Sequence, residues 1–403
     1  MTIRTRTQTR VSQHRKQHIA ERANKLSPSG IRKFFDLLSG MEGVISLGVG
    51  EPDFPTPWHI REAAIESIEK GQTMYTSNSG TPELRKELAR HLMSYYGVDY
   101  DPTSEILITV GVSEALDLAM RAILDPGDEV IHPDPSFVAY NSSIILAEGI
   151  PVAIPTYEKT NFEISASDIE KCVTRNKTRA ILLGYPSNPT GAVMSRQKLV
   201  NIAELAQRRN LTVISDEIYA KLVYGMEHTC FAALPGMKDH TILLGGFSKA
   251  YAMTGWRVGY AAAPKEIIAA MTKIHQYTMM CASTMGQVAA LEALRGDQDC
   301  VKEMVEDYNR RRLVIVKGLC DIGLSCFEPK GAFYAFPSIR CTGMSSEEFA
   351  ERLLAEEKVA VVPGSAFGDC GEGYVRCCYA TALEDIEEAL KRMKRFVNKY
   401  RKA

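Results

Sequence analysis

The sequence predicts an α/β fold in which helices flank a mostly parallel sheet, with a smaller α+β domain attached. Between about residues 105 and 250, short apolar segments alternate with segments whose apolar residues recur at helical spacing. The apolar segments are continuous, which is typical of parallel strands that are buried on both faces. After about residue 265, long helical patterns are followed by short strand-like runs, which indicates the second domain.

The elements follow from these patterns in chain order. Strands are predicted at 105–111, 128–134, 151–156, 179–184, 211–216 and 241–246, with helices at 113–124 and 196–210 between them. The second domain is predicted to contain a charged helix at 298–319 and strands at 331–336, 358–364 and 374–380. We therefore expect a mobile basic tail (1–24), an N-terminal segment that joins the small domain (25–56), a large domain (57–295) and a small C-terminal domain (296–403).

Composition argues against several classes of protein. The 403 residues carry a formal net charge of -1 with no basic stripe, which argues against a nucleic-acid or membrane partner. The ten cysteines form no CxxC pair or other zinc spacing, so we expect no metal site and reduced thiols in a cytoplasmic protein. We also expect no membrane span and no signal peptide. The first twenty residues contain no acid, as in an organelle transit segment, and cleavage of this tail stays open.

Chemistry-bearing residues follow the predicted strands at the edge where such sheets bind ligands. Lys249 comes after the strand at 241–246, Asp216 ends the strand at 211–216, and Asn188 lies in the turn YPSNPTG. The helix that begins at Gly111-Val112-Ser113 could bind an anion, although glycine and serine are also ordinary caps. No GxGxxG or GxxxxGK[ST] motif is present, which argues against a dinucleotide-dependent dehydrogenase and a P-loop nucleotidase.

Lys249 stands among small and apolar residues in GGFSKAYAMTGWRVG (245–259). A lysine that is desolvated in this way loses proton affinity and can form a Schiff base. Asp216 could be an ordinary turn-forming or helix-capping residue at the end of a strand. Its functional interpretation is a buried anion that keeps a heterocyclic nitrogen protonated.

Six motifs in order resemble the class I and II aminotransferases, which are pyridoxal-phosphate enzymes of fold type I. They are GEPDFPTP (50–57), YTSNSGTPELR (75–85), YPSNPTG (185–191), ISDEIY (214–219), the lysine segment at 245–259 and GEGYVRCCYA (371–380). The resemblance extends from about Leu26 to near the C-terminus. It implies a pyridoxal 5'-phosphate cofactor and transfer of an amino group from an L-amino acid to a 2-oxo acid such as 2-oxoglutarate by a ping-pong cycle.

The resemblance also implies roles for individual residues. Lys249 would hold the cofactor as a Schiff base and move the substrate α-proton, and Asp216 would pair with the pyridine nitrogen. The remaining cofactor contacts implied are Asn188 and Tyr219 at the phenolic oxygen, Phe137 on the ring face, and Gly111, Val112, Ser113, Ser248 and Arg257 at the phosphate. Tyr75 would reach the phosphate from a second subunit, so a homodimer with shared active sites is implied. Arg376, with Gly50 and Asn188, would bind the substrate α-carboxylate.

Several alternatives stay open. Phe137 and Tyr75 could be core aromatics, and Gly246 stands where many relatives have a serine or threonine that contacts phosphate. Aspartate aminotransferases generally recognise a second carboxylate with an arginine in the segment that here reads KIHQYTMM (273–280), or with a lysine at the position that here is Ser113. This sequence has neither, which favours an aromatic-type or broad specificity. Tyr140, Phe333 and Tyr334 could line an apolar side-chain pocket, whereas Arg32 and Lys33 keep acidic substrates possible. A lyase or synthase on the same scaffold is the nearest alternative. A cofactor-sensing regulator would need a DNA-binding domain, which the short basic tail cannot supply.

Overall fold

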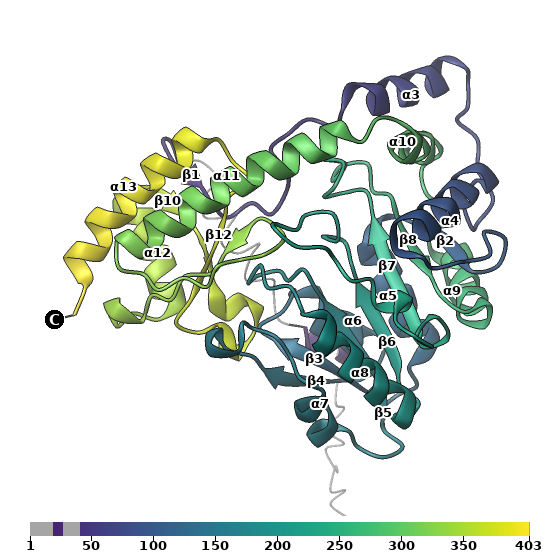
Figure 1. Cartoon of the computed structure of the whole chain (residues 1–403), viewed down its shortest axis with the longest axis horizontal. Helices are drawn as coiled ribbons and strands as arrows, with labels where there is room; N and C mark the ends of the chain where they lie inside the picture. Colours follow the sequence, from purple (N-terminus) through teal and green to yellow (C-terminus); the bar gives the residue numbers. More distant parts are fainter. Residues whose placement is uncertain (1–18, 27–40, 403) are drawn as a thin grey trace, which may run out of the picture.

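A computed structural model describes residues 19–26 and 41–402, and in this part of the chain a seven-stranded sheet forms the centre of the larger lobe (Figure 1). Its order is β2-β8-β7-β6-β5-β3-β4. The strands are β2 (Ile106–Thr109), β3 (Glu129–Asp134), β4 (Ile150–Pro155), β5 (Thr178–Gly184), β6 (Thr212–Asp216), β7 (Thr241–Gly246) and β8 (Gly259–Ala262). Only β8 pairs antiparallel with its neighbours, so the prediction of a mostly parallel sheet is confirmed.

Helices cover both faces of this sheet, which is why its strands are continuously apolar. Leu107, Ile242 and Leu244 face α5 (Gly111–Ile123), α6 (Ala139–Leu146) and α9 (Lys265–Thr278). Alternate residues such as Ile108 and Leu243 pack on the opposite face. That face is covered by α3 (Trp58–Glu69), α4 (Pro82–Tyr96) and α10 (Thr284–Arg295) at one end, and by α7 (Ala166–Cys172) and α8 (Arg196–Arg209) at the other. Each strand therefore buries both of its rows of side chains.

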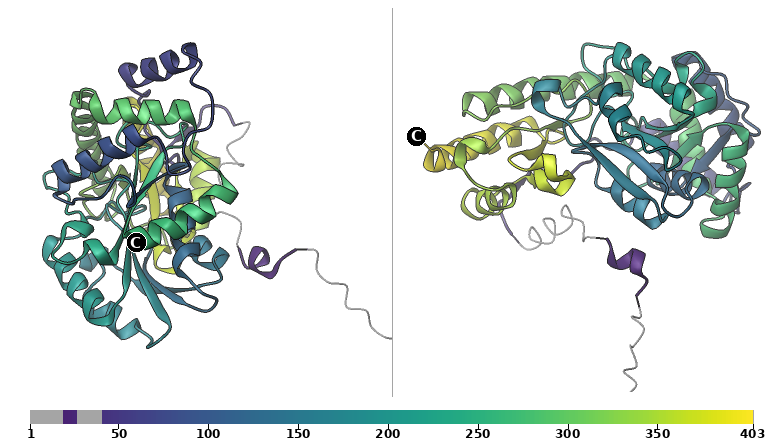
Figure 2. Two further views of the ribbon diagram at one scale, coloured as in Figure 1. Left: turned by 90° about the vertical axis from the view of Figure 1, so that its right-hand side faces the viewer. Right: turned by 90° about the horizontal axis from the view of Figure 1, so that it is seen from below.

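A second lobe holds the C-terminal part of the chain (Figure 2). Its three-stranded antiparallel sheet has the order β11-β12-β9, and β1 pairs in parallel with β10. The strands are β1 (Ile45–Ser46), β9 (Tyr334–Ala335), β10 (Val359–Ala360), β11 (Val362–Pro363) and β12 (Val375–Cys378). The helices are α11 (Asp299–Asp321), α12 (Ser346–Glu357) and α13 (Leu383–Tyr400). In Figure 1, α11 runs from beside α10 into this lobe.

The first described segment, residues 19–26, contacts the larger lobe. A short helix, α1 (Glu21–Asn24), is joined to the main lobe by an ion pair between Arg22 and Glu148 at 3.0 Å. The domain boundaries expected from the sequence stay predictions. Within residues 19–26 and 41–402, no helix has both the length and the apolar composition needed to cross a bilayer.

Candidate active site

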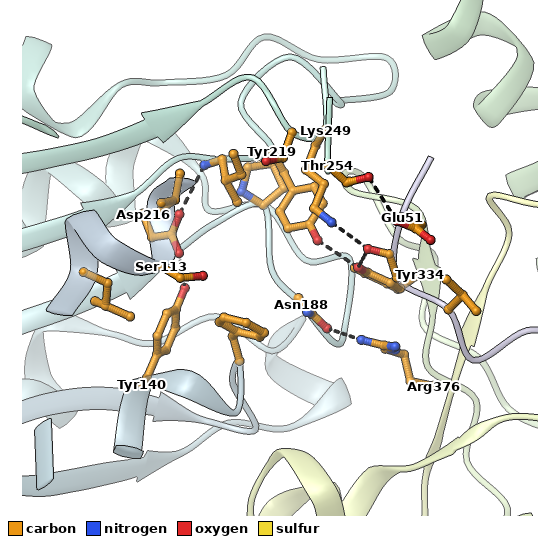
Figure 3. Close-up of a pocket in the computed structure, with 18 of the residues that line it drawn as sticks. Glu51, Ser113, Tyr140, Asn188, Asp216, Tyr219, Lys249, Thr254, Tyr334 and Arg376 are labelled. Carbon is orange, nitrogen blue, oxygen red and sulfur yellow. Dashed lines mark hydrogen bonds between the residues drawn. The ribbon is translucent and has the colours of Figure 1, made fainter. Parts of the chain in front are cut away.

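A cavity of about 450 Å³ lies beyond the carboxyl ends of β5, β6 and β7, and residues of both lobes line it (Figure 3). It brings together eleven of the residues singled out in the sequence. These are Gly50, Val112, Ser113, Phe137, Asn188, Asp216, Tyr219, Ser248, Lys249, Arg257 and Arg376. The rule that α/β sheets bind ligands at the carboxyl ends of their strands therefore located the cavity correctly.

Lys249 projects into the cavity from the segment that follows β7. Its Nζ donates a hydrogen bond to the main-chain oxygen of Gly50 at 2.6 Å and lies 5.8 Å from the ring centroid of Tyr219. Burial lowers the pKa of Lys249 to about 8, helped by the nearby positive charge of Arg376. An appreciable fraction of this amine is therefore neutral, and thus nucleophilic, near neutral pH.

Asp216 ends β6 with its carboxylate buried in the floor of the cavity. Tyr140 donates a hydrogen bond to Oδ2 at 2.9 Å, and the main-chain N–H of Ile218 donates to Oδ1 at 3.2 Å. Burial nevertheless raises the pKa of Asp216 to about 6, because two hydrogen bonds only partly offset the loss of water. The site therefore contains a buried carboxylate whose charge a cationic ligand group would stabilise.

The amino end of α5 and the side chain of Arg257 form one corner of the cavity. Gly111 has φ +75°, and a Cβ built there would lie 2.3 Å from an Nη atom of Arg257, so only glycine lets the guanidinium approach the helix end. A Cβ built on Gly259, at the start of β8, would lie 2.6 Å from the carbonyl carbon of Gly111. A helix N-terminus with free N–H groups beside a guanidinium suits a phosphate.

The substitution of glycine for a hydroxyl residue at position 246 has a steric explanation. A Cβ built on Gly246 would lie 2.9 Å from Cγ2 of Val112 and 3.2 Å from Cα of Gly259. The Val112 side chain therefore occupies the space that a serine or threonine would need.

Arg376 extends from β12 across the boundary between the lobes. One Nη donates to Oδ1 of Asn188 at 2.9 Å, and the other donates to the main-chain oxygen of Gly48 at 2.7 Å. Its Nε is buried with no hydrogen-bond partner, although the guanidinium stacks over the rings of Tyr334 and Phe367 at 4.5 and 4.9 Å. A buried cation with an unused donor fits a carboxylate ligand.

Two tyrosines close the wall between Lys249 and Arg376. The hydroxyls of Tyr219 and Tyr334 are 2.8 Å apart, and the Tyr334 hydroxyl lies 3.4 Å from the main-chain oxygen of Gly50. Burial raises the pKa of both tyrosines, so both hydroxyls are protonated donors at neutral pH.

Other residues expected at the site have different places. Gly111 lies behind Arg257 rather than on the cavity wall, and Tyr75 is 81% exposed, away from the cavity of its own chain. Phe333 is buried in the core of the second lobe, with its ring 5.6 Å from Nζ of Lys249. Arg32 and Lys33 lie outside the described residues.

Sequence reasoning missed two contacts at the cavity. Glu51 accepts a hydrogen bond from the Thr254 hydroxyl at 3.0 Å, and both residues line the wall (Figure 3). They belong to the motifs at 50–57 and 245–259, but nothing local links the two segments. The sequence left open whether Tyr140 lines an apolar side-chain pocket, and it gave no sign that its hydroxyl bonds to Asp216. Among the described residues, no cluster of three or more His, Cys, Asp or Glu side chains could hold a metal ion.

Comparisons with known proteins agree with the fold and the cavity. A family model described as aminotransferase class I and II matches residues 42–393. The chain is 47% identical to an aromatic-amino-acid aminotransferase of Thermococcus litoralis and to an aspartate aminotransferase of Pyrococcus abyssi, in both cases over 94% of this chain and 97% of the relative. The crystal structure of an aromatic aminotransferase from Pyrococcus horikoshii superimposes with a TM-score of 0.87 at 46% identity, over 91% of this chain and 99% of that one. The chain is therefore an aminotransferase and belongs to the class I and II family.

Proposed function

We propose that the protein uses pyridoxal 5'-phosphate to move the amino group of an L-amino acid, aromatic or of broad range, to a 2-oxo acid by a ping-pong cycle. One observation carries the proposal. An amine with a lowered pKa, Lys249, and a buried carboxylate with a raised pKa, Asp216, follow neighbouring strands and line one cavity. These two groups suit the aldehyde and the pyridine nitrogen of this cofactor.

The residues present fit the rest of the cofactor as well. The corner formed by the amino end of α5 and Arg257 suits its phosphate, and Ser248, 7% exposed, lies beside it on the cavity wall. Phe137 lies on the same wall and would stack on the ring, while Asn188 and Tyr219 would donate hydrogen bonds to its phenolic oxygen. When bound, pyridoxal phosphate supplies an aldehyde that condenses with amines and a ring that withdraws electrons from the substrate α-carbon.

The protein residues would then bind, orient and move a proton. Arg376 would hold the substrate carboxylate with a bidentate pair, next to Gly50 and Asn188, and so orient the α-carbon. Lys249 would take the α-proton on Nζ and return it elsewhere, which its pKa of about 8 permits near neutral pH. Asp216 would stay ionised and hold a proton on the ring nitrogen.

The substrate side of the cavity supports an aromatic or broad range. Its described lining contains three cations, Lys249, Arg257 and Arg376, each with a role above, and no further cation for a second carboxylate. Val49, Leu116 and Tyr334 provide apolar surface. Aspartate is the second candidate donor. It would need a cation for its side-chain carboxylate from outside residues 19–26 and 41–402, such as Arg32 or Lys33.

We further propose a cytoplasmic homodimer. All ten cysteines are free thiols, as expected in a reducing compartment. Tyr75, 81% exposed, would contact the phosphate of the other subunit, and Met74 beside it, 79% exposed, would be covered by the same contact.

The test is to add pyridoxal phosphate and then single L-amino acids, without an oxo acid, while recording visible absorbance. We expect a visible band that borohydride fixes covalently at Lys249, and bleaching by tyrosine, phenylalanine and glutamate. Lys249→Ala should abolish turnover while the variant keeps its fold, as judged by circular dichroism. Bleaching by aspartate and glutamate alone would favour the aspartate donor. A protein that binds no cofactor, or a Lys249→Ala variant with turnover like wild type, would refute the proposal.

A further inference from the structure

Residues 48–54, here called the strap, bind both cations of the substrate side through main-chain oxygens. The oxygen of Gly48 accepts from Arg376 at 2.7 Å, and the oxygen of Gly50 accepts from Lys249 at 2.6 Å. Arg376 comes from β12 and Lys249 from the segment after β7, so the strap connects groups carried by the two lobes. The position of the strap therefore fixes how far these two cations reach into the cavity.

The strap has little freedom to shift at this point. A Cβ built on Gly50 would lie 2.7 Å from the Tyr334 hydroxyl, so the backbone is already in close contact with the cavity wall. The next residue, Glu51, accepts a hydrogen bond from Thr254 at 3.0 Å (Figure 3). A displacement of even an ångström would break these contacts and the two carbonyl bonds.

An ion pair outside the cavity holds the far end of the strap. Oδ2 of Asp53 lies 2.7 Å from an Nη atom of Arg311 on α11, and the Tyr308 hydroxyl lies 3.3 Å from Oδ1 of Asp53. The side chains of Arg311 and Asp53 are 11% and 29% exposed. The same Nη also donates to the main-chain oxygen of Thr381, which follows β12. The Phe54 ring packs edge-on against Tyr308 at 5.6 Å.

Arg311 has a second acidic partner within its own helix, Asp307, at 2.6 Å. Loss of Asp53 therefore leaves Arg311 paired, and α11 keeps its charge balance. Apart from the contact with Tyr308, the loss of Asp53 therefore falls on the strap. Because the Asp53–Arg311 pair is mostly shielded from water, it restrains the strap more than an exposed pair would.

We propose that Asp53 and Arg311 are positioning residues that hold the strap so that Arg376 is aligned for the substrate carboxylate. This inference rests on the proposed function, because it assigns substrate binding to that cavity. Asp53 and Arg311 lie outside the lining of the cavity and act on it through the bond from Arg376 to Gly48. The pair therefore affects the affinity for the amino acid, whereas Lys249, which moves the proton, is carried by the segment after β7. Its loss should raise KM with little change in kcat.

The experiment compares Asp53→Ala, Arg311→Gln and the double variant as holoenzymes. Arg310→Gln is the matched control, since Arg310 neighbours Arg311 on α11 but its side chain is 75% exposed and pairs with Asp307 on the same helix rather than with the strap. The readouts are KM, kcat, the dissociation constant of an α-methyl amino acid, which binds but has no α-proton to transfer, and the thermal midpoint. We expect each single variant to raise KM and that dissociation constant roughly tenfold, with kcat within about twofold. The double variant should be no worse than either single one.

The outcomes separate this inference from the proposed function. Variants with the KM of wild type, a double variant whose effects multiply, or a kcat that falls as much as kcat/KM would overturn the positioning role. An effect of the same size in Arg310→Gln would also overturn it. If the wild-type protein transfers no amino group, the proposed function fails instead.

Discussion

Replacing Tyr140 by phenylalanine should change how cofactor binding depends on pH. The substitution removes the hydrogen bond of 2.9 Å to Oδ2 of Asp216 and leaves the ring in place. A hydrogen bond to a charged group contributes about 1.5–3 kcal/mol, which corresponds to about one to two pKa units. The pKa of Asp216, about 6 in the wild-type chain, should therefore rise by that amount, because the ionised form loses one of its two donors.

The sign follows from linkage. The cofactor needs Asp216 ionised, so affinity falls as pH drops below the pKa of this carboxyl in the free protein. A higher pKa of Asp216 therefore shifts this loss of cofactor affinity to higher pH. From the shift above, Tyr140→Phe should bind pyridoxal phosphate roughly five- to fiftyfold more weakly than wild type at pH 6, and about equally at pH 9.

The assay is the dissociation constant of pyridoxal phosphate from absorbance titrations at several pH values, expressed as the ratio of variant to wild type. This ratio cancels the titration of the cofactor itself. Tyr185→Phe is the control, because Tyr185 is also buried and donates a bond of 2.9 Å, but to the main-chain oxygen of Phe162. A ratio for Tyr140→Phe that is flat from pH 6 to 9, or the same pH dependence in the control, would refute the reasoning.

Two further predictions concern the ends of the cavity. Gly111→Ala should weaken pyridoxal phosphate binding roughly tenfold, because a left-handed backbone costs a non-glycine residue about 1–2 kcal/mol and the new Cβ would meet Arg257. Binding of pyridoxal, which has no phosphate, should change less, and equal losses for both ligands would contradict a phosphate site there. Arg376→Lys should raise KM for the amino acid roughly tenfold, because lysine keeps the positive charge but loses the planar guanidinium that binds a carboxylate with two hydrogen bonds. Steady-state kinetics measure this, and an unchanged KM would remove Arg376 from carboxylate binding.

Much of the cavity could be predicted because its main residues follow strands with strong local patterns. Lys249 and Asp216 come after continuous apolar runs that become β7 and β6, and parallel strands place their carboxyl ends at one edge. The antiparallel strand β8 was not predicted. Its sequence, GYAA, is short and rich in small residues, so no periodicity distinguishes it from a loop.

The contacts that the sequence could not predict join residues far apart in the chain. Tyr140 meets Asp216 across 76 positions, and Arg311 meets Asp53 across 258. Each pair depends on the packing of whole elements: the place of α6 against the sheet in the first case, and the course of the strap along α11 in the second. Local patterns carry no information about such packing, which only the assembled fold supplies.

The tight contact between Gly246 and Val112 also limits how this protein can be altered. A serine designed at position 246 to strengthen phosphate binding would bring its Cβ to 2.9 Å from Cγ2 of Val112 and to 3.2 Å from Cα of Gly259. Trimming Val112 to alanine would relieve only the first of these conflicts. Substitutions at positions 112 and 246 are therefore epistatic, because the effect of a serine at 246 depends on which residue stands at 112. A route that adds the hydroxyl therefore needs a smaller residue at 112 and a small shift of the backbone at Gly259 as well.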